Sequence, residues 1–131
     1  MSISDPIADA LTRIRNAQSA LHETVEVKSN TVIESILSIL QEEGFVQSAT
    51  AYKDGETRKV KVELKYYKDK PVIRGIKRVS KPGRRVYTSW KEIQPFRNNI
   101  GLNIFSTPKG VLSGKEAKYQ HTGGEYLCRV W

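Results

Sequence analysis

The chain has 131 residues and a formal net charge of +8, from 22 basic and 14 acidic residues. This length allows one domain or two small ones, and the 38% of apolar residues are spread widely enough to exclude a disordered chain. No apolar run approaches the ~18 residues of a membrane span, and the first residues lack the pattern of a signal peptide. We therefore expect no membrane partner. The single cysteine excludes an internal disulfide and fits a cytoplasmic protein.

The positive charge is concentrated in the second half of the chain. Residues 1–66 contain 8 Lys/Arg and 10 Asp/Glu, whereas residues 67–131 contain 14 Lys/Arg and 4 Asp/Glu. The short polar segment 68–71 lies at this change. We therefore predict an N-terminal α/β domain over residues 1–66 and a basic, mostly β domain over residues 67–131. A one-sided excess of positive charge indicates a polyanionic partner such as RNA.

The first helix is predicted to begin at Pro6, with Asp5 as its N-cap. An apolar stripe at helical spacing follows, formed by Ile7, Leu11, Ile14 and Leu21. Three polar side chains fall off this stripe, namely Thr12, Arg15 and Asn16. They form either a solvated face or a contact to an RNA phosphate, and the residues alone leave both alternatives open.

The rest of the first half predicts one more helix and three strands. Alternation at Val25 and Val27 indicates a short strand, and the Thr31–Glu34 spacing predicts a capping box for a second helix. Gly44 ends that helix, and Asp54-Gly55 predicts a hairpin turn between two strands. The predicted order is α-β-α-β-β.

The second half is predicted to be mostly antiparallel β-structure with one short helix. This gives an α+β fold class of two small α/β domains. The expected elements are a strand over 72–79, a turn over 80–83, a return strand over 84–88, a strand over 102–105, a helix near 115–120 and a strand over 125–131.

Basic residues crowd around the hairpin expected near residue 82. They are Arg74, Lys77, Arg78, Lys81, Arg84 and Arg85. Tyr87 follows directly, and cations beside an aromatic ring are typical of nucleic-acid contacts. The alternative interpretation is that these residues form the solvent-exposed face of an ordinary sheet. In combination with the turn described next, we favour RNA binding.

The stretch 106–111 combines two hydroxyls, a cation and a glycine. Ser106 and Thr107 follow a short apolar strand, and Lys109 and Gly110 come next. Because Ser113 and Glu116 have capping-box spacing, we expect 106–111 to be a strand-to-helix turn. Such a turn can direct hydroxyls and backbone N–H groups at a phosphate or a base edge, although the same residues also make plain loops.

Catalytic alternatives have little support in the residues. A thiol enzyme using Cys128, with His121 and Glu125, is the strongest of them. However, Cys128 falls in an alternating strand, where a small buried apolar role is commoner. The spacing of His and Cys predicts no metal site, and no glycine-rich phosphate loop is present. We therefore predict a protein without enzymatic activity, cofactor or small-molecule substrate.

The chain resembles the ribosomal small-subunit protein eight family, bacterial type. The resemblance covers nearly the whole chain in the family's order. It is carried by the segments Asp5 to Asn16, Glu42 to Phe45, Arg78 to Gly83, Ser106 to Val111, Gly123 to Cys128 and the terminal Trp131. Each segment by itself is weak evidence for the family, but the whole set in this order is highly specific for it.

This resemblance implies two α/β domains packed side by side, in a structural constituent of the ribosome. It implies a primary RNA-binding protein of the central domain of small-subunit ribosomal RNA that supports subunit assembly, with neighbouring small-subunit proteins as partners. The implied RNA-facing residues are Ser106, Thr107 and Lys109, with Tyr87 and Glu125 nearby, and Thr12, Arg15 and Asn16 form a secondary contact. The family usually has a serine where this chain has Pro108, so one hydroxyl is missing.

The sequence leaves open a second function within RNA binding and a second compartment. Some members of the family repress translation of their own operon's messenger RNA, so a messenger-binding regulator is the alternative within RNA binding. Organelle-encoded members also exist, which leaves a plastid ribosome as the alternative to the cytoplasm.

Overall fold

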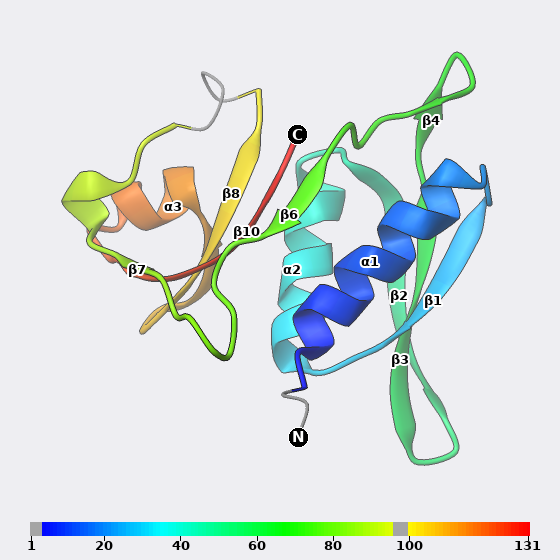
Figure 1. Ribbon diagram of the computed structural model, residues 1–131, viewed down its shortest axis with the longest axis horizontal. Coiled ribbons are helices and arrows are strands. Elements are labelled where there is room, and N and C mark those ends of the chain that lie inside the picture. The colour runs from blue at the N-terminus through cyan, green and yellow to red at the C-terminus, as the bar shows by residue number, and fades with distance from the viewer. Residues whose placement is uncertain (1–3, 96–99) are drawn as a thin grey trace. The chain divides into compact units, whose positions relative to one another are not determined.

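The computed structural model describes residues 4–95 and 100–131, which divide into two compact units (Figure 1). The N-terminal unit spans Pro6–Arg74, and the C-terminal unit spans Gly75–Trp131 together with the residues before Pro6. Residues 66 and 67, where the sequence predicts a boundary, form strand β4 (Tyr66–Tyr67) of the N-terminal unit. The domains predicted at that boundary stay a prediction.

The N-terminal unit has the predicted order of its first five elements, α-β-α-β-β. A three-stranded antiparallel sheet has the order β1-β3-β2, and a separate hairpin joins β4 to β5. The elements are α1 (Pro6–Ser19), β1 (Thr24–Lys28), α2 (Thr31–Glu42), β2 (Val46–Asp54), β3 (Thr57–Leu64), β4 and β5 (Lys70–Pro71).

Local signals explain where these elements begin and end. Helix α1 begins at Pro6 as predicted. The capping-box prediction at Thr31 was wrong by one residue, because the side chain of Asn30 caps α2 and accepts a hydrogen bond of 2.9 Å from the N–H of Ile33. The hairpin predicted at Asp54-Gly55 is confirmed, since Asp54 pairs with Thr57 across the turn between β2 and β3.

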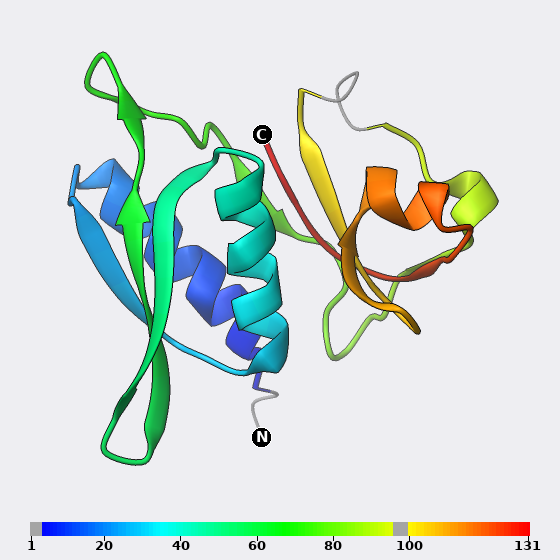
Figure 2. The ribbon, with the colours of Figure 1, turned by 180° about the vertical axis from the view of Figure 1, so that it is seen from behind.

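Alternation along β3 gives the sheet one apolar face, against which α1 and α2 pack. Both helices turn their apolar stripes toward this face, whereas the opposite face of the sheet bears charged side chains such as Lys61. Figure 2 shows the strands from the side opposite to that of Figure 1. The buried apolar side chains are Ala10, Leu11, Ile14 and Ala17 from α1, Ile33, Ile36, Leu37 and Leu40 from α2, and Val27, Val46, Val60, Val62 and Leu64 from the sheet.

The C-terminal unit is built around its last strand. Strand β10 pairs antiparallel with β6, β7 and β8, and β8 pairs in turn with β9. The elements are β6 (Ile76–Arg78), β7 (Tyr87–Thr88), the short 3₁₀ helix η1 (Trp90–Glu92), β8 (Leu102–Thr107), β9 (Gly110–Ser113), α3 (Gly114–Tyr119) and β10 (Gly124–Val130). With this unit, the predicted α+β class is confirmed.

The hairpin predicted over 72–88 forms only in part. Its first strand is limited to β6, its second to β7, and the backbone pairing between the two arms is an isolated bridge from Lys81 to Arg84. Both strands pair with β10 instead of with each other. The sequence could show that these residues favour strands, but their partners lie 36 to 54 positions further along the chain.

The turn at 106–110 also differs from the prediction. Thr107 pairs with Gly110, so Pro108 and Lys109 are the two central residues of a tight β8–β9 hairpin. Strand β9 separates this turn from helix α3, and a strand-to-helix turn was therefore wrong. The capping prediction is confirmed, because the hydroxyl of Ser113 accepts a 3.2 Å hydrogen bond from the N–H of Glu116.

A small apolar cluster holds α3 on the C-terminal sheet. Its buried members are Ile93, Phe105 and Ala117, with Trp90, Leu112 and Tyr126 packed around them. No helix in the described ranges is both long and apolar enough to cross a membrane.

Candidate nucleic-acid interface

Pairing across the C-terminal sheet brings three predicted RNA-facing residues into one row. Glu125 of β10 pairs with Tyr87 of β7 on one side and with Ser106 of β8 on the other. Directly opposed residues of antiparallel strands share a face of the sheet. Phe105 and Tyr126 pair one position along, with ring centroids 4.6 Å apart and planes inclined by 31°. Because Phe105 belongs to the cluster under α3, the row faces away from that helix.

Tyr87 is the exposed aromatic member of this row. Its side chain is 70% exposed, while Ser106 and Glu125 are partly buried. Exposure of a large ring to water is unfavourable, and this ring does not contribute to the core. It offers a flat surface on which a base can stack. The row therefore combines an aromatic face, a hydroxyl and a carboxylate.

A basic turn precedes β7 in the sequence. The backbone groups of Lys81 and Arg84 exchange two hydrogen bonds of 3.0 and 2.9 Å, with Pro82 and Gly83 between them. Lys81, Arg84 and Arg85 are all exposed. This turn presents three cations from one short segment, a composition that suits contact with phosphates.

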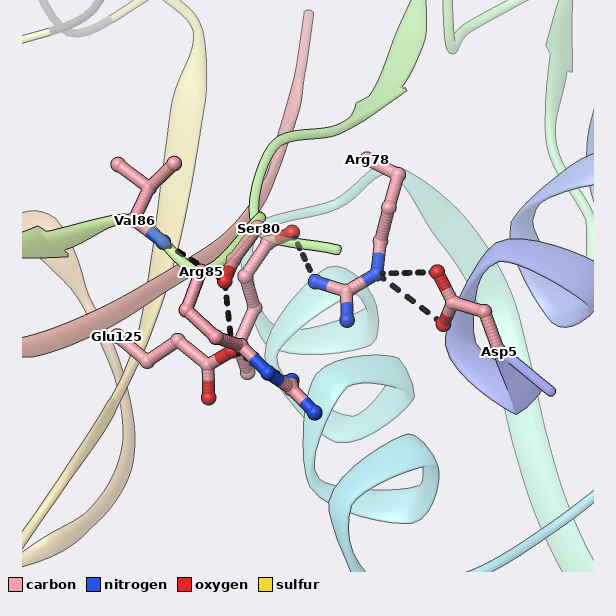
Figure 3. A network of polar contacts seen from close by, with 7 residues as sticks. Asp5, Arg78, Ser80, Arg85, Val86 and Glu125 are labelled. Carbon is pink, nitrogen blue, oxygen red and sulfur yellow. Dashed lines mark hydrogen bonds and ion pairs between the residues drawn. The ribbon is translucent and has the colours of Figure 1, made fainter. Parts of the chain in front are cut away.

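Glu125 joins the row to the basic turn through hydrogen bonds. Its Oε2 atom accepts from the Ser80 hydroxyl at 2.6 Å and from Nη1 of Arg85 at 2.8 Å, and the Ser80 hydroxyl accepts from the N–H of Val86 at 3.0 Å (Figure 3). Burial by itself would raise the pKa of Glu125, but the hydrogen bonds from Ser80 and Arg85, with the charges of Arg85 and Arg78, lower it overall. Glu125 therefore stays ionised and orients Arg85.

Arg78 does not belong to the exposed basic group that the sequence predicts. Its side chain is 7% exposed, and its Nε lies 3.2 Å from a carboxylate oxygen of Asp5. Nη1 donates to the carbonyl oxygen of Leu127 at 2.7 Å. This guanidinium is held inside the unit by protein groups, so it supports the fold and not a surface contact.

The β8–β9 turn is closed by its own side chains. The Thr107 hydroxyl donates to the carbonyl oxygen of Gly110 at 2.8 Å and accepts from the N–H of Lys109 at 3.1 Å. Gly110 has a φ of +112°, a left-handed conformation that favours glycine. The Lys109 ammonium donates to the carbonyl oxygen of Gln120 at 3.1 Å, just beyond α3. Thr107 has thus donated its only hydroxyl proton and can offer a ligand an acceptor only.

The predicted secondary contact lies on one face of α1. Thr12, Arg15 and Asn16 are exposed at positions i, i+3 and i+4, so their side chains are neighbours on the helix. They lie in the N-terminal unit, apart in sequence from the row on the C-terminal sheet.

The thiol site is not supported by the geometry. Cys128 is completely buried, and this burial raises the pKa of its thiol to about 12, although the charge of Arg78 acts in the opposite direction. A thiol that stays protonated and out of solvent is a poor nucleophile. Within residues 4–95 and 100–131, no group of three or more His, Cys, Asp or Glu side chains could hold a metal ion.

A family model described as ribosomal protein S8 matches residues 5–131. The chain belongs to this family. The small ribosomal subunit protein uS8 of Leptospira biflexa is 55% identical over 132 residues, covering all of both chains. That of Roseiflexus castenholzii is 50% identical over the same length and coverage, and that of Nitratidesulfovibrio vulgaris is 49% identical over 129 residues, with 98% of this chain and 99% of the relative covered.

Membership of the S8 family confirms the predicted resemblance and decides between two functional classes. S8 proteins are structural constituents of the ribosome and not enzymes, which rejects the thiol-enzyme alternative. The sequence reasoning missed one important residue. Ser80 is completely buried and bonded to Glu125, and the available signal was its place directly before the basic turn, which is typical of a residue that shapes a turn.

Proposed function

We propose that the C-terminal unit binds small-subunit ribosomal RNA, in its central domain, and supports assembly of the small subunit. The observation that carries this proposal is the row of Tyr87, Glu125 and Ser106, connected through Arg85 to the basic turn. The uS8 relatives are named as proteins of the small ribosomal subunit, which supports this RNA as the partner.

Cations of the C-terminal unit contact the RNA backbone. Lys81, Arg84 and Arg85 are exposed around one turn, and Lys109 is exposed on the β8–β9 turn, where its ammonium also donates to the carbonyl oxygen of Gln120. Each phosphate that they neutralise releases counterions, so these contacts supply affinity with little dependence on sequence. Residues 67–131 are therefore expected to carry most of the RNA affinity.

The row supplies the contacts that distinguish one RNA site from another. Both hydrogen bonds to Glu125 end on Oε2, so Oε1 is placed to accept from a base amino group. The Ser106 hydroxyl can both donate and accept, and the Tyr87 ring can stack on a splayed base. Gly110 lets the backbone of the turn approach the RNA closely.

The face of Thr12, Arg15 and Asn16 makes a second, weaker backbone contact. Arg15 provides the charge, and the two neutral side chains add hydrogen bonds to phosphate or sugar oxygens. Neighbouring small-subunit proteins are the further partners, in the cytoplasm or, for an organelle-encoded chain, in the plastid.

Matched double substitutions test the proposal. The change Lys81→Gln/Arg84→Gln should weaken binding to purified small-subunit ribosomal RNA about tenfold or more, since a hydrogen bond to a charged group nets about 1.5–3 kcal/mol. It should also reduce the magnitude of the salt slope by about 1 for each cation removed. The control Lys53→Gln/Lys61→Gln removes the same charge from exposed positions of the N-terminal unit. Equal losses in the two variants would contradict the proposal.

The messenger-binding alternative needs a different measurement. If the chain is a subunit component, it should co-sediment with small subunits at high salt in stoichiometric amounts. A chain found only on free messenger RNA would favour the regulator.

A further inference from the structure

A stacked pair of rings lies next to the proposed RNA-binding row. Tyr87 pairs with Glu125, and Thr88 pairs with Gly124. Continuing along the same two segments, the rings of Trp90 and His121 stack with centroids 4.2 Å apart and planes inclined by 19°. Three residues of extended chain reach at most about 10 Å, so Trp90 lies near Tyr87 along the chain, but its cluster is on the α3 side of the sheet and the row is on the opposite side. An RNA segment that contacts both therefore has to pass around the edge of the sheet at β7.

The two rings differ in burial. Trp90 is half-buried and packs against the cluster of Ile93, Phe105 and Ala117, which fixes its position. His121 is exposed and covers Trp90 from outside. Since one face of the imidazole contacts Trp90, its second face can receive another flat ring.

The backbone at His121 favours glycine, although histidine is among the other residues that adopt this conformation. Its φ is +53°, in the left-handed region where glycine has the lowest cost, and it follows the C-terminal end of α3. The N–H of His121 donates to the carbonyl oxygen of Lys118 at 3.1 Å, as expected where a helix ends. The chain thus holds an imidazole at a position where the backbone geometry alone would select glycine.

Two ammonium groups flank the pair. Lys91 Nζ lies 5.7 Å from the centroid of the Trp90 ring. Lys109 Nζ is bonded to the carbonyl oxygen of Gln120, the residue before His121. Rings with cations close by match the composition of surfaces that bind single-stranded nucleic acid, in which bases stack and phosphates contact the charges.

We propose that the stack of Trp90 and His121, flanked by Lys91 and Lys109, receives an unpaired base of the RNA bound by the Tyr87 row. The inference rests on the proposed function and extends it to a second base site on the same unit. Stacking needs only the π-face of the base, so this site adds affinity with little selection among bases. Its position beyond the β7–β10 pairing sets the direction in which the bound strand leaves the row.

Substitution of each ring tests the inference in the full-length chain. His121→Gly removes the imidazole and supplies the residue that the left-handed backbone favours, so the fold should be retained. Trp90→Leu removes the deeper ring and keeps apolar contact with the core. Each variant should bind purified small-subunit ribosomal RNA about fivefold more weakly or worse.

Fluorescence gives a direct readout of stacking. The chain has two tryptophans, so Trp131→Phe leaves Trp90 as the sole reporter. Small-subunit ribosomal RNA should quench that emission, and it should leave the emission of the Trp90→Phe variant nearly unchanged.

The N-terminal unit offers a matched control. Tyr67 is 70% exposed, and Lys68 Nζ lies 5.4 Å from its ring centroid, so it is also a ring with a flanking lysine. Tyr67→Leu should change RNA affinity less than twofold.

Three outcomes would overturn the inference. The first is unchanged RNA affinity in both His121→Gly and Trp90→Leu. The second is unchanged RNA affinity with reduced incorporation into small subunits, which would show that the stack meets a protein. The third, a parent chain that fails to bind the RNA at all, would overturn the proposed function itself and is recognised before any variant is compared.

Discussion

The two units contain equal numbers of basic residues and very different numbers of acidic ones. Residues 6–74 have 11 Lys/Arg and 10 Asp/Glu, whereas the remaining residues have 11 Lys/Arg and 4 Asp/Glu. The positive charge of the C-terminal unit therefore comes from missing carboxylates, not from extra cations. In the N-terminal unit, Arg58 is paired with Glu34 and Lys59 with Asp54.

The cores of the two units also differ, and that of the C-terminal unit is smaller and more polar. Two helices and a three-stranded sheet enclose a continuous apolar layer in the N-terminal unit. The C-terminal unit combines a smaller cluster with buried polar groups, among them Ser80 and Arg78. We infer that the first unit mainly supplies stability, and that the second accepts a more polar interior because Glu125 and Arg85 have to be held in place for binding.

The largest effect is expected where two backbones of the C-terminal unit approach closely. A Cβ at Gly124 would clash with the carbonyl oxygen of Ser106, and backbone atoms cannot move aside without separating β8 from β10. Gly124→Val should reduce the free energy of unfolding by about 4 kcal/mol or more, measured by urea denaturation. The control Gly83→Ala meets open space and should cost less than about 0.5 kcal/mol. Similar costs would show that the contact is not rigid.

A substitution that creates a cavity in the core of the N-terminal unit should lower stability without weakening RNA binding. Leu40 is completely buried in α2, and Leu40→Ala should cost about 3 kcal/mol by loss of burial and creation of a cavity. At a temperature where the variant is folded, its affinity for small-subunit ribosomal RNA should stay within about twofold of the parent's. A tenfold loss of affinity in the folded variant would end the division of roles between the units.

The polar network of the C-terminal unit can be tested by pH. Ser80→Ala leaves the partly buried N–H of Val86 without its acceptor and should cost about 1–2 kcal/mol. It also removes a hydrogen bond that lowers the pKa of Glu125. Because that pKa is below its usual value in the folded chain, ionised Glu125 stabilises the fold above its unfolded pKa, and this contribution is lost as the pH falls through the folded pKa.

The stability of the Ser80→Ala variant should therefore fall less steeply than that of the parent on acidification below about pH 4.5. The measurement is the free energy of unfolding at a series of pH values. A steeper fall in the variant would mean that Ser80 does not support the charge of Glu125.

The smallest effects are expected at the β8–β9 turn. Thr107→Ala loses both hydrogen bonds that close the turn and should weaken binding to small-subunit ribosomal RNA about fivefold, whereas Thr107→Ser keeps the hydroxyl. Lys109→Ala should weaken cognate and scrambled RNA hairpins alike. Pro108→Ser regains the family's hydroxyl but loses a fixed φ, and the two effects offset each other to within about twofold.

These three changes are compared by titration at one fixed salt concentration. A larger shift for Pro108→Ser than for Thr107→Ala would show that the missing hydroxyl matters more than the closed turn.

Local signals in the sequence determined the elements and the charge. Pro6 began α1, Gly44 followed α2, and Asp54-Gly55 made the hairpin, because each depends on conformational preferences within a few residues. The burial of Cys128 also followed from alternation in one strand. The contrast between the two halves in acidic residues is a property of composition and needs no coordinates.

The tertiary structure alone decided which of these residues act together. Arg78 and Arg85 look equivalent in the sequence, yet one is buried against Asp5 and the other is exposed beside Glu125. The row of Tyr87, Glu125 and Ser106 depends on strand pairings across 19 and 38 positions. Such pairings are set by the burial and hydrogen bonding of the whole sheet, for which the periodicity of a single strand carries no information.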